Sequence, residues 1–517
     1  MPPTIPNVPL VRRSLAGWAA LAATIVVASY VFTLLLAVAC AYLPYLLLTS
    51  PSFSGFQALG LAACGLVMSA TILWSLVPRR DRFVAPGVPL DRSIQPRLFA
   101  ELESIANALN EPMPQDVYIT LEVNAWVAER GGTMGFRSRR VMGLGLPLLQ
   151  TLTVPQFRAV VAHEFGHYYC GDTRLGPWVY KTRDAMVRTL VRLSSDSELM
   201  NVLTRVAFAR LAHHLVIEIL NAYWKLFMRA TQMISRKQEY RADELACHVA
   251  GSEALIEGLG RIAAASPALR MFWQTEVVPT LSAGYHMPIA DGFARFLTAP
   301  AIAGAMSKHL ETVLHSASTQ PYDTHPTLRD RIAAARLLPT QRETRPAPPA
   351  ISLFDDINGV ELQILANLNH EKAATLKTSS WERVGPEVYV PMWRAEVRQY
   401  SFLLAGLTVD CLPDAVGKLR EMSASIRDPT GMLLTREQRV ERAASLLWMA
   451  LTLALITGGW NLHPEPGELY LEQGERRLKP PEVIGQMRDG TLSREQWAER
   501  CRSAGIAGLR LDNCAPD

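Results

Sequence analysis

The sequence predicts a mainly helical α+β protein that is anchored by an N-terminal hairpin of two transmembrane helices. Three observations carry this prediction: an uncharged run from Ser14 to Pro78, helical spacing of polar residues in segments 153–172 and 235–246, and short β-like segments between 116 and 145. The uncharged run is about twice as long as one membrane helix requires. At 517 residues the chain is also long enough for more than one domain.

The uncharged run is divided by the sequence PSFSG at 51–55, so we expect two spans, near Leu15–Tyr42 and Phe56–Leu76, within a hairpin domain of residues 1–82. Basic residues flank its outer ends: Arg12, Arg13, Arg79, Arg80 and Arg82. The positive-inside rule then places both ends, and everything after residue 79, in the cytoplasm. The alternative is a cleaved secretory signal, but the apolar core of a signal is much shorter.

Composition limits the remaining possibilities. A net charge of +4 is too small to suggest a nucleic-acid partner. The seven cysteines form no C-x-x-C pair, which indicates a reducing compartment without a disulfide framework.

The pattern H-E-x-x-H is formed by His163, Glu164 and His167, in a helix that Thr153 and Gln156 are expected to begin with a capping box. The two histidines are four residues apart, so both imidazoles project from one face, as two ligands of one Zn²⁺ must. Glu164 then lies beside the metal, where a general base can take a proton from the attacking water. A chance match on a buried helix is the alternative, and a third ligand would decide between them.

A candidate third ligand lies in the sequence SRKQEYRADELA at 235–246, which is typical of a helix. Glu239 and Asp243 are four residues apart there, so Glu239 can ligate the metal while Asp243 holds a ligand histidine in one tautomer. Two histidines and one glutamate leave a fourth position open, which is the pattern of a catalytic zinc site with one Zn²⁺ per chain.

Four motifs, in this order, resemble the family of membrane-bound zinc metallopeptidases that includes HtpX and the CAAX prenyl proteases. They are N-A-W at 124–126, H-E-F-G-H at 163–167, S-R-x-x-E-Y-x-A-D at 235–243, and T-H-P at 324–326 followed by Arg331. The resemblance implies a gluzincin-type metallopeptidase domain over residues 83–338. It assigns His163, His167 and Glu239 as zinc ligands, Glu164 as the catalytic base, and Asp243 as the carboxylate behind the ligands.

Two further residues follow from the same resemblance. Asn124 would lie on an edge strand near the substrate backbone, and the alternative is an ordinary turn or strand-end residue. His325 would approach the cleft as a second catalytic side chain, where its imidazole could donate a hydrogen bond to the oxyanion. An ordinary loop histidine is the alternative.

Around these motifs we expect a helix over Asp91–Leu109 and strands at 116–120, 123–128 and 139–145. The segment Val206–Ile234 is apolar but is interrupted by charged and histidine side chains, among them His213, His214, Glu218, Lys225 and Arg229. It therefore predicts an amphipathic or core helix, or one that lies against the membrane surface. Relatives of the HtpX type usually carry further hydrophobic spans here.

The C-terminal part begins with a proline-rich linker at 339–350, followed by an accessory α+β region, 351–430, and a C-terminal accessory domain, 431–517. Within the last we expect a buried helix at Ala443–Trp460, a hairpin at 469–480 and a helix capped by Ser493. No chemical motif follows residue 340, so the partner proteins of this region are unknown.

The sequence therefore predicts an integral membrane zinc endopeptidase of the bacterial inner membrane, with its catalytic domain in the cytoplasm and proteins or peptides as substrates. From the resemblance, misfolded or surplus membrane proteins would be cleaved, or more narrowly prenylated peptides. The alternative from another class is a non-catalytic membrane scaffold or sensor whose fold is stabilised by zinc.

Overall fold

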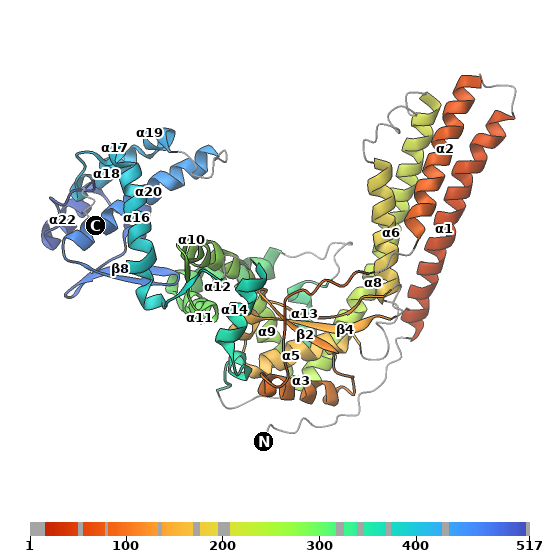
Figure 1. Cartoon of the computed structure of the whole chain (residues 1–517), viewed down its shortest axis with the longest axis horizontal. Helices are drawn as coiled ribbons and strands as arrows, with labels where there is room; N and C mark the ends of the chain where they lie inside the picture. The colour runs from red at the N-terminus through yellow and green to blue at the C-terminus, as the bar shows by residue number, and fades with distance from the viewer. Residues whose placement is uncertain are drawn as a thin grey trace. The chain divides into compact units, whose positions relative to one another are not determined.

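The computed structural model describes residues 16–49, 55–77, 81–132, 137–168, 176–194, 207–316, 325–338, 346–368, 374–426 and 434–512 (Figure 1). The chain divides into two compact units. Unit 1 comprises Met1–Ala264 and His309–Val360, and unit 2 comprises Ala265–Lys308 and Glu361–Asp517. The mainly helical α+β class is confirmed, whereas the domain boundaries that the sequence suggests stay predictions.

The N-terminal hairpin consists of α1 (Ala16–Leu48) and α2 (Gly55–Leu76). Both contain stretches that are long and apolar enough to cross a membrane, Ala20–Leu46 and Leu59–Leu76. Gly65 lets the two helices approach closely, because a Cβ there would lie 2.2 Å from the backbone oxygen of Cys40. The hairpin is therefore a packed pair of helices, as the sequence predicts.

Two more helices of unit 1 pack along this hairpin: α6 (Gly176–Ser194) and the first half of α8 (Ala207–Ala250) (Figure 1). Leu193 of α6 and Leu220 of α8 are buried in one cluster with Met68 and Ile72 of α2. Large apolar side chains nevertheless remain exposed on α8: Phe208, Leu211, Leu215, Ile219 and Leu226. The segment Val206–Ile234, for which the sequence predicted an amphipathic or core helix, thus packs beside the two predicted membrane spans.

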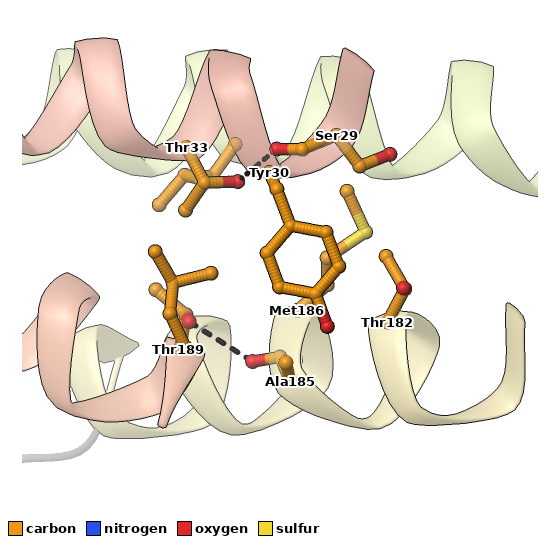
Figure 2. A pocket seen from close by; sticks show the side chains of 9 residues that line it. Ser29, Tyr30, Thr33, Thr182, Ala185, Met186 and Thr189 are labelled. Carbon is orange, nitrogen blue, oxygen red and sulfur yellow. Dashed lines mark hydrogen bonds between the residues drawn. The ribbon is translucent and has the colours of Figure 1, made fainter. Parts of the chain in front are cut away.

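A small pocket lined mainly by hydroxyl-bearing and apolar side chains lies among these helices (Figure 2). Its volume is about 10 Å³, roughly the space of one water molecule. Thr33 and Thr189 donate to carbonyl oxygens of their own helices, at Ser29 and Ala185. Polar side chains satisfied within their own helix can be buried in apolar surroundings at little cost.

The sheet of unit 1 has four strands in the order β1-β2-β4-β3: β1 (Val88–Pro89), β2 (Asp116–Thr120), β3 (Ala125–Arg130) and β4 (Arg139–Gly145). β2 and β4 are parallel, and the other pairs are antiparallel. The indole of Trp126, on β3, packs directly against Gly143. Any larger residue at 143 would clash with it, because a Cβ there would lie 2.4 Å from the ring. The strands expected at 116–120 and 139–145 are confirmed, whereas the one expected at 123–128 spans Ala125–Arg130 and so begins after Asn124. β3 is an edge strand.

The helices around this sheet bring the two metal-binding motifs together. α5 (Val154–Gly166) packs against α8, and Gly166 allows the close crossing because a Cβ there would lie 3.0 Å from Cα of Ala242. The predicted capping box begins α5, with the Gln156 side chain accepting from the backbone N–H of Thr153 at 3.0 Å. The other elements are α3 (Pro96–Ala108), α4 (Leu146–Thr151), α9 (Ser252–Phe272), α12 (Pro300–Ser316), α13 (Leu328–Ala335) and α14 (Ile357–Leu368).

A buried ion pair joins α5 to α3, with Nε of Arg158 2.7 Å from Oε1 of Glu101. Replacing Arg158 with leucine leaves the carboxylate buried without a partner, so we expect the free energy of unfolding to fall by about 3–5 kcal/mol. Chemical unfolding of the detergent-solubilised protein measures this. The control is Arg97→Leu, which breaks a pair with Asp355 whose arginine is 58% exposed. Equal losses in the two variants would contradict the prediction.

Unit 2 is built around aromatic side chains: Phe272, Phe293, Phe296, Trp381 and Trp497 are fully buried. Its helix α20 (Arg436–Thr457) is more than half buried along its apolar stretch, although it is also long and apolar enough to cross a membrane. The predicted hairpin is present as β8 and β9, and Ser493 caps α22. The remaining elements of unit 2 include α10 (Val278–Ser282), α11 (Ile289–Thr298), α16 (Val390–Gln399), α18 (Leu412–Gly417), β7 (Asn461–Glu465), β8 (Glu468–Gln473), β9 (Arg476–Leu478), α21 (Pro480–Arg488) and α22 (Arg494–Ala504).

Candidate metal centre

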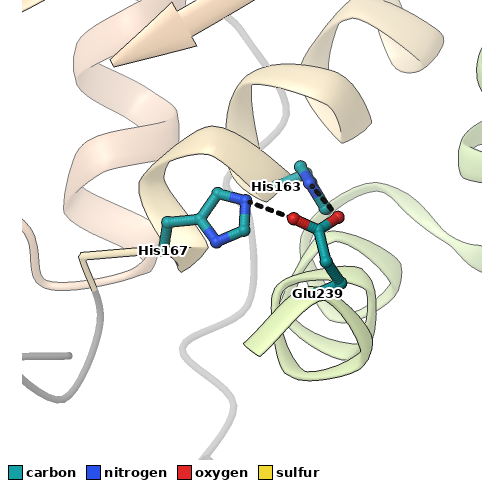
Figure 3. A group of neighbouring side chains, drawn as sticks. All are labelled: His163, His167 and Glu239. Carbon is teal, nitrogen blue, oxygen red and sulfur yellow. Dashed lines mark ion pairs between the residues drawn. The ribbon is translucent and has the colours of Figure 1, made fainter. Parts of the chain in front are cut away.

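Three side chains of unit 1 converge between α5 and α8: His163, His167 and Glu239 (Figure 3). One nitrogen or oxygen atom from each lies within 4.8 Å of the others. Nε2 of His163 is 3.6 Å from Oε2 of Glu239, and Nε2 of His167 is 3.5 Å from Oε1. The i, i+4 spacing on α5 produces this arrangement, because the two rings project from the same face at a centroid distance of 4.7 Å.

Asp243 lies directly behind His163. Its Oδ1 is 2.9 Å from Nδ1 of His163, so the ring donates Nδ1–H to the carboxylate and keeps the Nε2 lone pair toward Glu239. Arg331, from α13, donates to both oxygens of Asp243, at 2.9 Å from Nε and 2.7 Å from Nη2. Hydrogen bonds from Arg331 to Asp243 and from His163 to Asp243 thus connect α13 to one of the candidate ligands.

The charge states of these groups suit a cation. The burial of His167, with His163 beside it, lowers the pKa of its imidazole to about 3, so the ring is neutral near pH 7. Burial opposes ionisation of Asp243, but hydrogen bonds from His163 and Arg331 prevail and lower its pKa to about 2. Burial likewise opposes ionisation of Glu239, yet its pKa is also lowered, chiefly by the hydrogen bond from His325. Neutral imidazoles and ionised carboxylates are the forms that bind metals.

One oxygen of the cluster has no hydrogen-bond partner in the structure. Oε2 of Glu239 is buried, and its ion-pair partners in the described part of the chain, Nε2 of His163 at 3.6 Å and Nη1 of Arg331 at 3.8 Å, lie beyond hydrogen-bond distance. A buried carboxylate oxygen without a hydrogen bond is costly, and a bound metal cation would offset that cost. Two imidazole nitrogens and a carboxylate are also the donor set that zinc accepts in catalytic sites. The residues present therefore fit a zinc ion.

Glu164 stands beside this cluster on α5 and is not one of the three convergent side chains. Glu164 as a whole is partly exposed, but its carboxyl group is buried, and this burial raises the pKa of the carboxyl group to about 7. A carboxyl group with a pKa near neutrality can both accept and release a proton, as a general base and acid must.

The other two predicted site residues are placed as follows. Nδ1 of His325 is 2.9 Å from Oε1 of Glu239, so its imidazole contacts the third candidate ligand, and its side chain is 62% exposed. Asn124 is exposed immediately before the edge strand β3, and its backbone oxygen accepts from the N–H of Gly145 at 2.9 Å. The preceding residue of the T-H-P motif, Thr324, lies outside the described residues.

The sequence placed Arg331 after the T-H-P motif without giving it a role, whereas the structure connects it to His163 through Asp243. Removing its guanidinium by Arg331→Ala frees the Asp243 carboxylate, and we expect a loss of about 10–100-fold in zinc affinity or activity. Competition with a chelator measures the affinity. The matched control is Arg329→Ala, two residues away with its side chain 57% exposed, which should change neither. Equal effects of the two substitutions would show that the contact with Asp243 is unimportant.

Comparison with known proteins agrees with the motifs. The sequence model of peptidase family M48 matches residues 93–338. This segment is similar to that family, and the resemblance to the membrane zinc metallopeptidases that include HtpX is confirmed.

Among curated proteins, the chain is similar to protease HtpX of Acinetobacter baumannii (strain AYE), with 27% identity over 194 residues, which are 37% of this chain and 56% of that protein. It is 30% identical to protease HtpX of Acinetobacter baylyi over 122 residues, 23% of this chain and 40% of the relative. It is 26% identical to protease HtpX of Stutzerimonas stutzeri over 251 residues, 46% and 71% of the two chains. The chain thus spans about half the length of the first of these relatives. No solved structure matches it significantly.

Proposed function

We propose that this protein is a membrane-anchored, zinc-dependent endopeptidase that hydrolyses peptide bonds of membrane or misfolded proteins. The observation that carries the proposal is the convergence of His163, His167 and Glu239, with ligand atoms within 4.8 Å of one another. The same three residues are the ones that the family motifs assign. A narrower substrate class, prenylated peptides, is the alternative that the family also suggests.

Each residue of the site would have its own role in peptide hydrolysis. Zinc bound by His163, His167 and Glu239 would polarise the scissile carbonyl and make water more acidic. Glu164 accepts the proton of the attacking water and delivers it to the nitrogen of the departing amine. Asp243 keeps His163 in the tautomer whose Nε2 is free to bind, and His325 is available as a hydrogen-bond donor at the edge of the site.

The edge strand β3 supplies a place for the substrate. β3 is paired only with β4 in the four-stranded sheet, so its other edge can pair with an extended peptide. Such binding uses backbone hydrogen bonds and therefore tolerates many sequences. Asn124, exposed immediately before this strand, would contact the peptide backbone.

The membrane anchor consists of α1 and α2, and we propose that α6 and the first half of α8 lie in the bilayer with them. Their packing against α2 and the exposed Leu211, Leu215 and Ile219 of α8 support this arrangement. The basic residues at both outer ends of the hairpin favour a cytoplasmic catalytic domain, in the inner membrane of a bacterium.

Zinc removal tests the proposal. The purified protein should hold about one zinc per chain and cleave casein or a solubilised membrane protein. A chelator should abolish cleavage, and added Zn²⁺ should restore it. Cleavage that survives complete loss of zinc would overturn the proposal, as would a zinc-loaded protein that cleaves neither substrate.

A further inference from the structure

A second site candidate lies in unit 2, among residues that the metallopeptidase chemistry does not use. A cavity of about 510 Å³ that opens to the surface is lined by residues of α10, α11, α12, α16, α20, α21 and the β7–β8 turn. This volume falls within the range of about 300–1,000 Å³ that ligand sites occupy. All of its lining residues belong to unit 2.

The wall of the cavity is aromatic. Tyr389 and Trp393 stack with centroids 5.5 Å apart, and Trp448 meets Trp393 edge-on at 5.4 Å. Met271 and Met392 line the same cavity and are 47% and 39% exposed. Flat rings beside unbranched, adaptable methionines are suited to an apolar ligand of irregular outline.

Hydrogen bonds to Glu276 hold this aromatic wall in place. The carboxylate of Glu276 accepts from the hydroxyl of Tyr389 and from the backbone N–H of Gly467 at the β7–β8 turn. Gly467 has a φ of +79°, and a Cβ there would lie 2.9 Å from the ring of Phe296. The turn and the tyrosine are therefore preorganised, which lowers the entropic cost of binding.

The rim of the cavity carries more negative than positive charge. The described lining residues include Glu465, Glu468 and Glu482 and one cation, Lys479, which is shared by Glu468 and Glu482 at 2.9 and 3.0 Å. The guanidinium of Arg477 also pairs with Glu468, at 3.3 Å. The guanidinium of Arg295, which approaches Glu465 at 3.4 Å, is also shared with Asp291 and Glu382. Such a rim attracts a cation and repels anionic groups such as phosphates.

We propose that this cavity is a peptide-binding site for an extended, proline-containing segment that carries a basic side chain at one end. Proline-rich segments are preformed in the polyproline II conformation and dock in aromatic-lined grooves at a low entropic cost. Here the prolines pack on Trp448 and the exposed methionines, while the basic side chain meets the acidic rim. Peptide binding at this site does not require zinc, so this proposal can be tested separately from the peptidase activity.

Binding of a labelled synthetic peptide, PPLPPLPRR, to the full-length protein in detergent tests the proposal by fluorescence anisotropy. The protein carries Glu164→Gln so that cleavage does not deplete the probe. We expect saturable binding that weakens as salt is raised. A peptide ending in two glutamates, and one with glycine in place of each proline, should each bind at least tenfold more weakly.

Substitutions locate the site. Ala301→Trp, at an exposed lining position, fills the cavity and should weaken binding at least tenfold, and Trp448→Ala should do the same. Glu482→Lys should weaken binding and remove most of its salt dependence. The matched control is Glu499→Lys on α22, 68% exposed and away from the cavity lining, which should leave binding unchanged. Unchanged thermal unfolding confirms that each variant is folded.

Three results would overturn the proposal: no saturable binding, binding that Ala301→Trp and Glu482→Lys leave unchanged, or binding that a chelator abolishes, since the last would place the peptide at the metal centre. Displacement of the probe by anionic phospholipid vesicles but not by unlabelled peptide would assign the cavity to lipid instead. Casein cleavage by the variants without the Glu164 substitution tests the peptidase proposal separately.

Discussion

Glu164→Gln is expected to reduce the rate of peptide cleavage by about 10³-fold, equivalent to ~4 kcal/mol of activation free energy, while zinc content stays near one per chain. The amide cannot accept the proton of the attacking water, yet it preserves the shape of the side chain. Because Glu164 is not one of the three convergent ligands, its loss leaves the donor set intact. Zinc content and casein cleavage, measured on the same preparation, check both halves of the prediction.

The control for this experiment is Glu164→Asp, which keeps a carboxylate but withdraws it by one methylene. It should retain more activity than the glutamine variant, because the aspartate carboxylate can still accept a proton from water although it lies farther away. If Glu164→Gln cleaves as fast as the wild type, a non-catalytic role for zinc, as in a membrane scaffold, becomes the better interpretation.

Glu239→Gln is expected to remove zinc and activity together. The substitution replaces the proposed ligand carboxylate with a neutral amide in a buried position where, among the described residues, one oxygen accepts no hydrogen bond. Loss of a residue behind a ligand already costs about 10–100-fold in affinity, so loss of a ligand should cost more than about 100-fold. Zinc retained after dialysis measures this.

The matched control is Glu244→Gln, five residues further along α8, where the carboxylate pairs with Arg241. It should bind zinc and cleave like the wild type. Full zinc occupancy in Glu239→Gln would show that the third ligand lies elsewhere and would contradict the proposed site.

The parts of the site that the sequence could predict are those set by local geometry. The spacing of His163 and His167, like that of Glu239 and Asp243, is one helical turn, so one face of each helix follows from the sequence once the helices are assigned. Thr153 and Gln156 marked the beginning of α5 in the same local way. These features depend on contacts between residues fewer than five positions apart.

What the sequence could not predict depends on long-range packing. The role of Arg331 rests on a contact with a residue 88 positions earlier, and its only local signal was its place six residues after His325 on a new helix. The first half of α8 was ambiguous for a different reason. Its charged side chains lower the average hydropathy, which conceals the apolar positions Leu211, Leu215 and Ile219 that remain exposed.

The continuous length of α8 has a mechanical consequence. Leu220, packed against the hairpin, and Glu239, at the metal centre, lie on one unbroken helix of 44 residues, about 28 Å apart along its axis. With α8 in the bilayer as we propose, tilting it to match a thinner membrane moves its far end sideways, and a tilt of about 5° over this length displaces Glu239 by roughly 2–3 Å. Misplacement by about 1 Å can cost a hundredfold in rate. The thickness of the surrounding lipid would then act as a regulator of proteolysis, transmitted by the helix as a rigid lever.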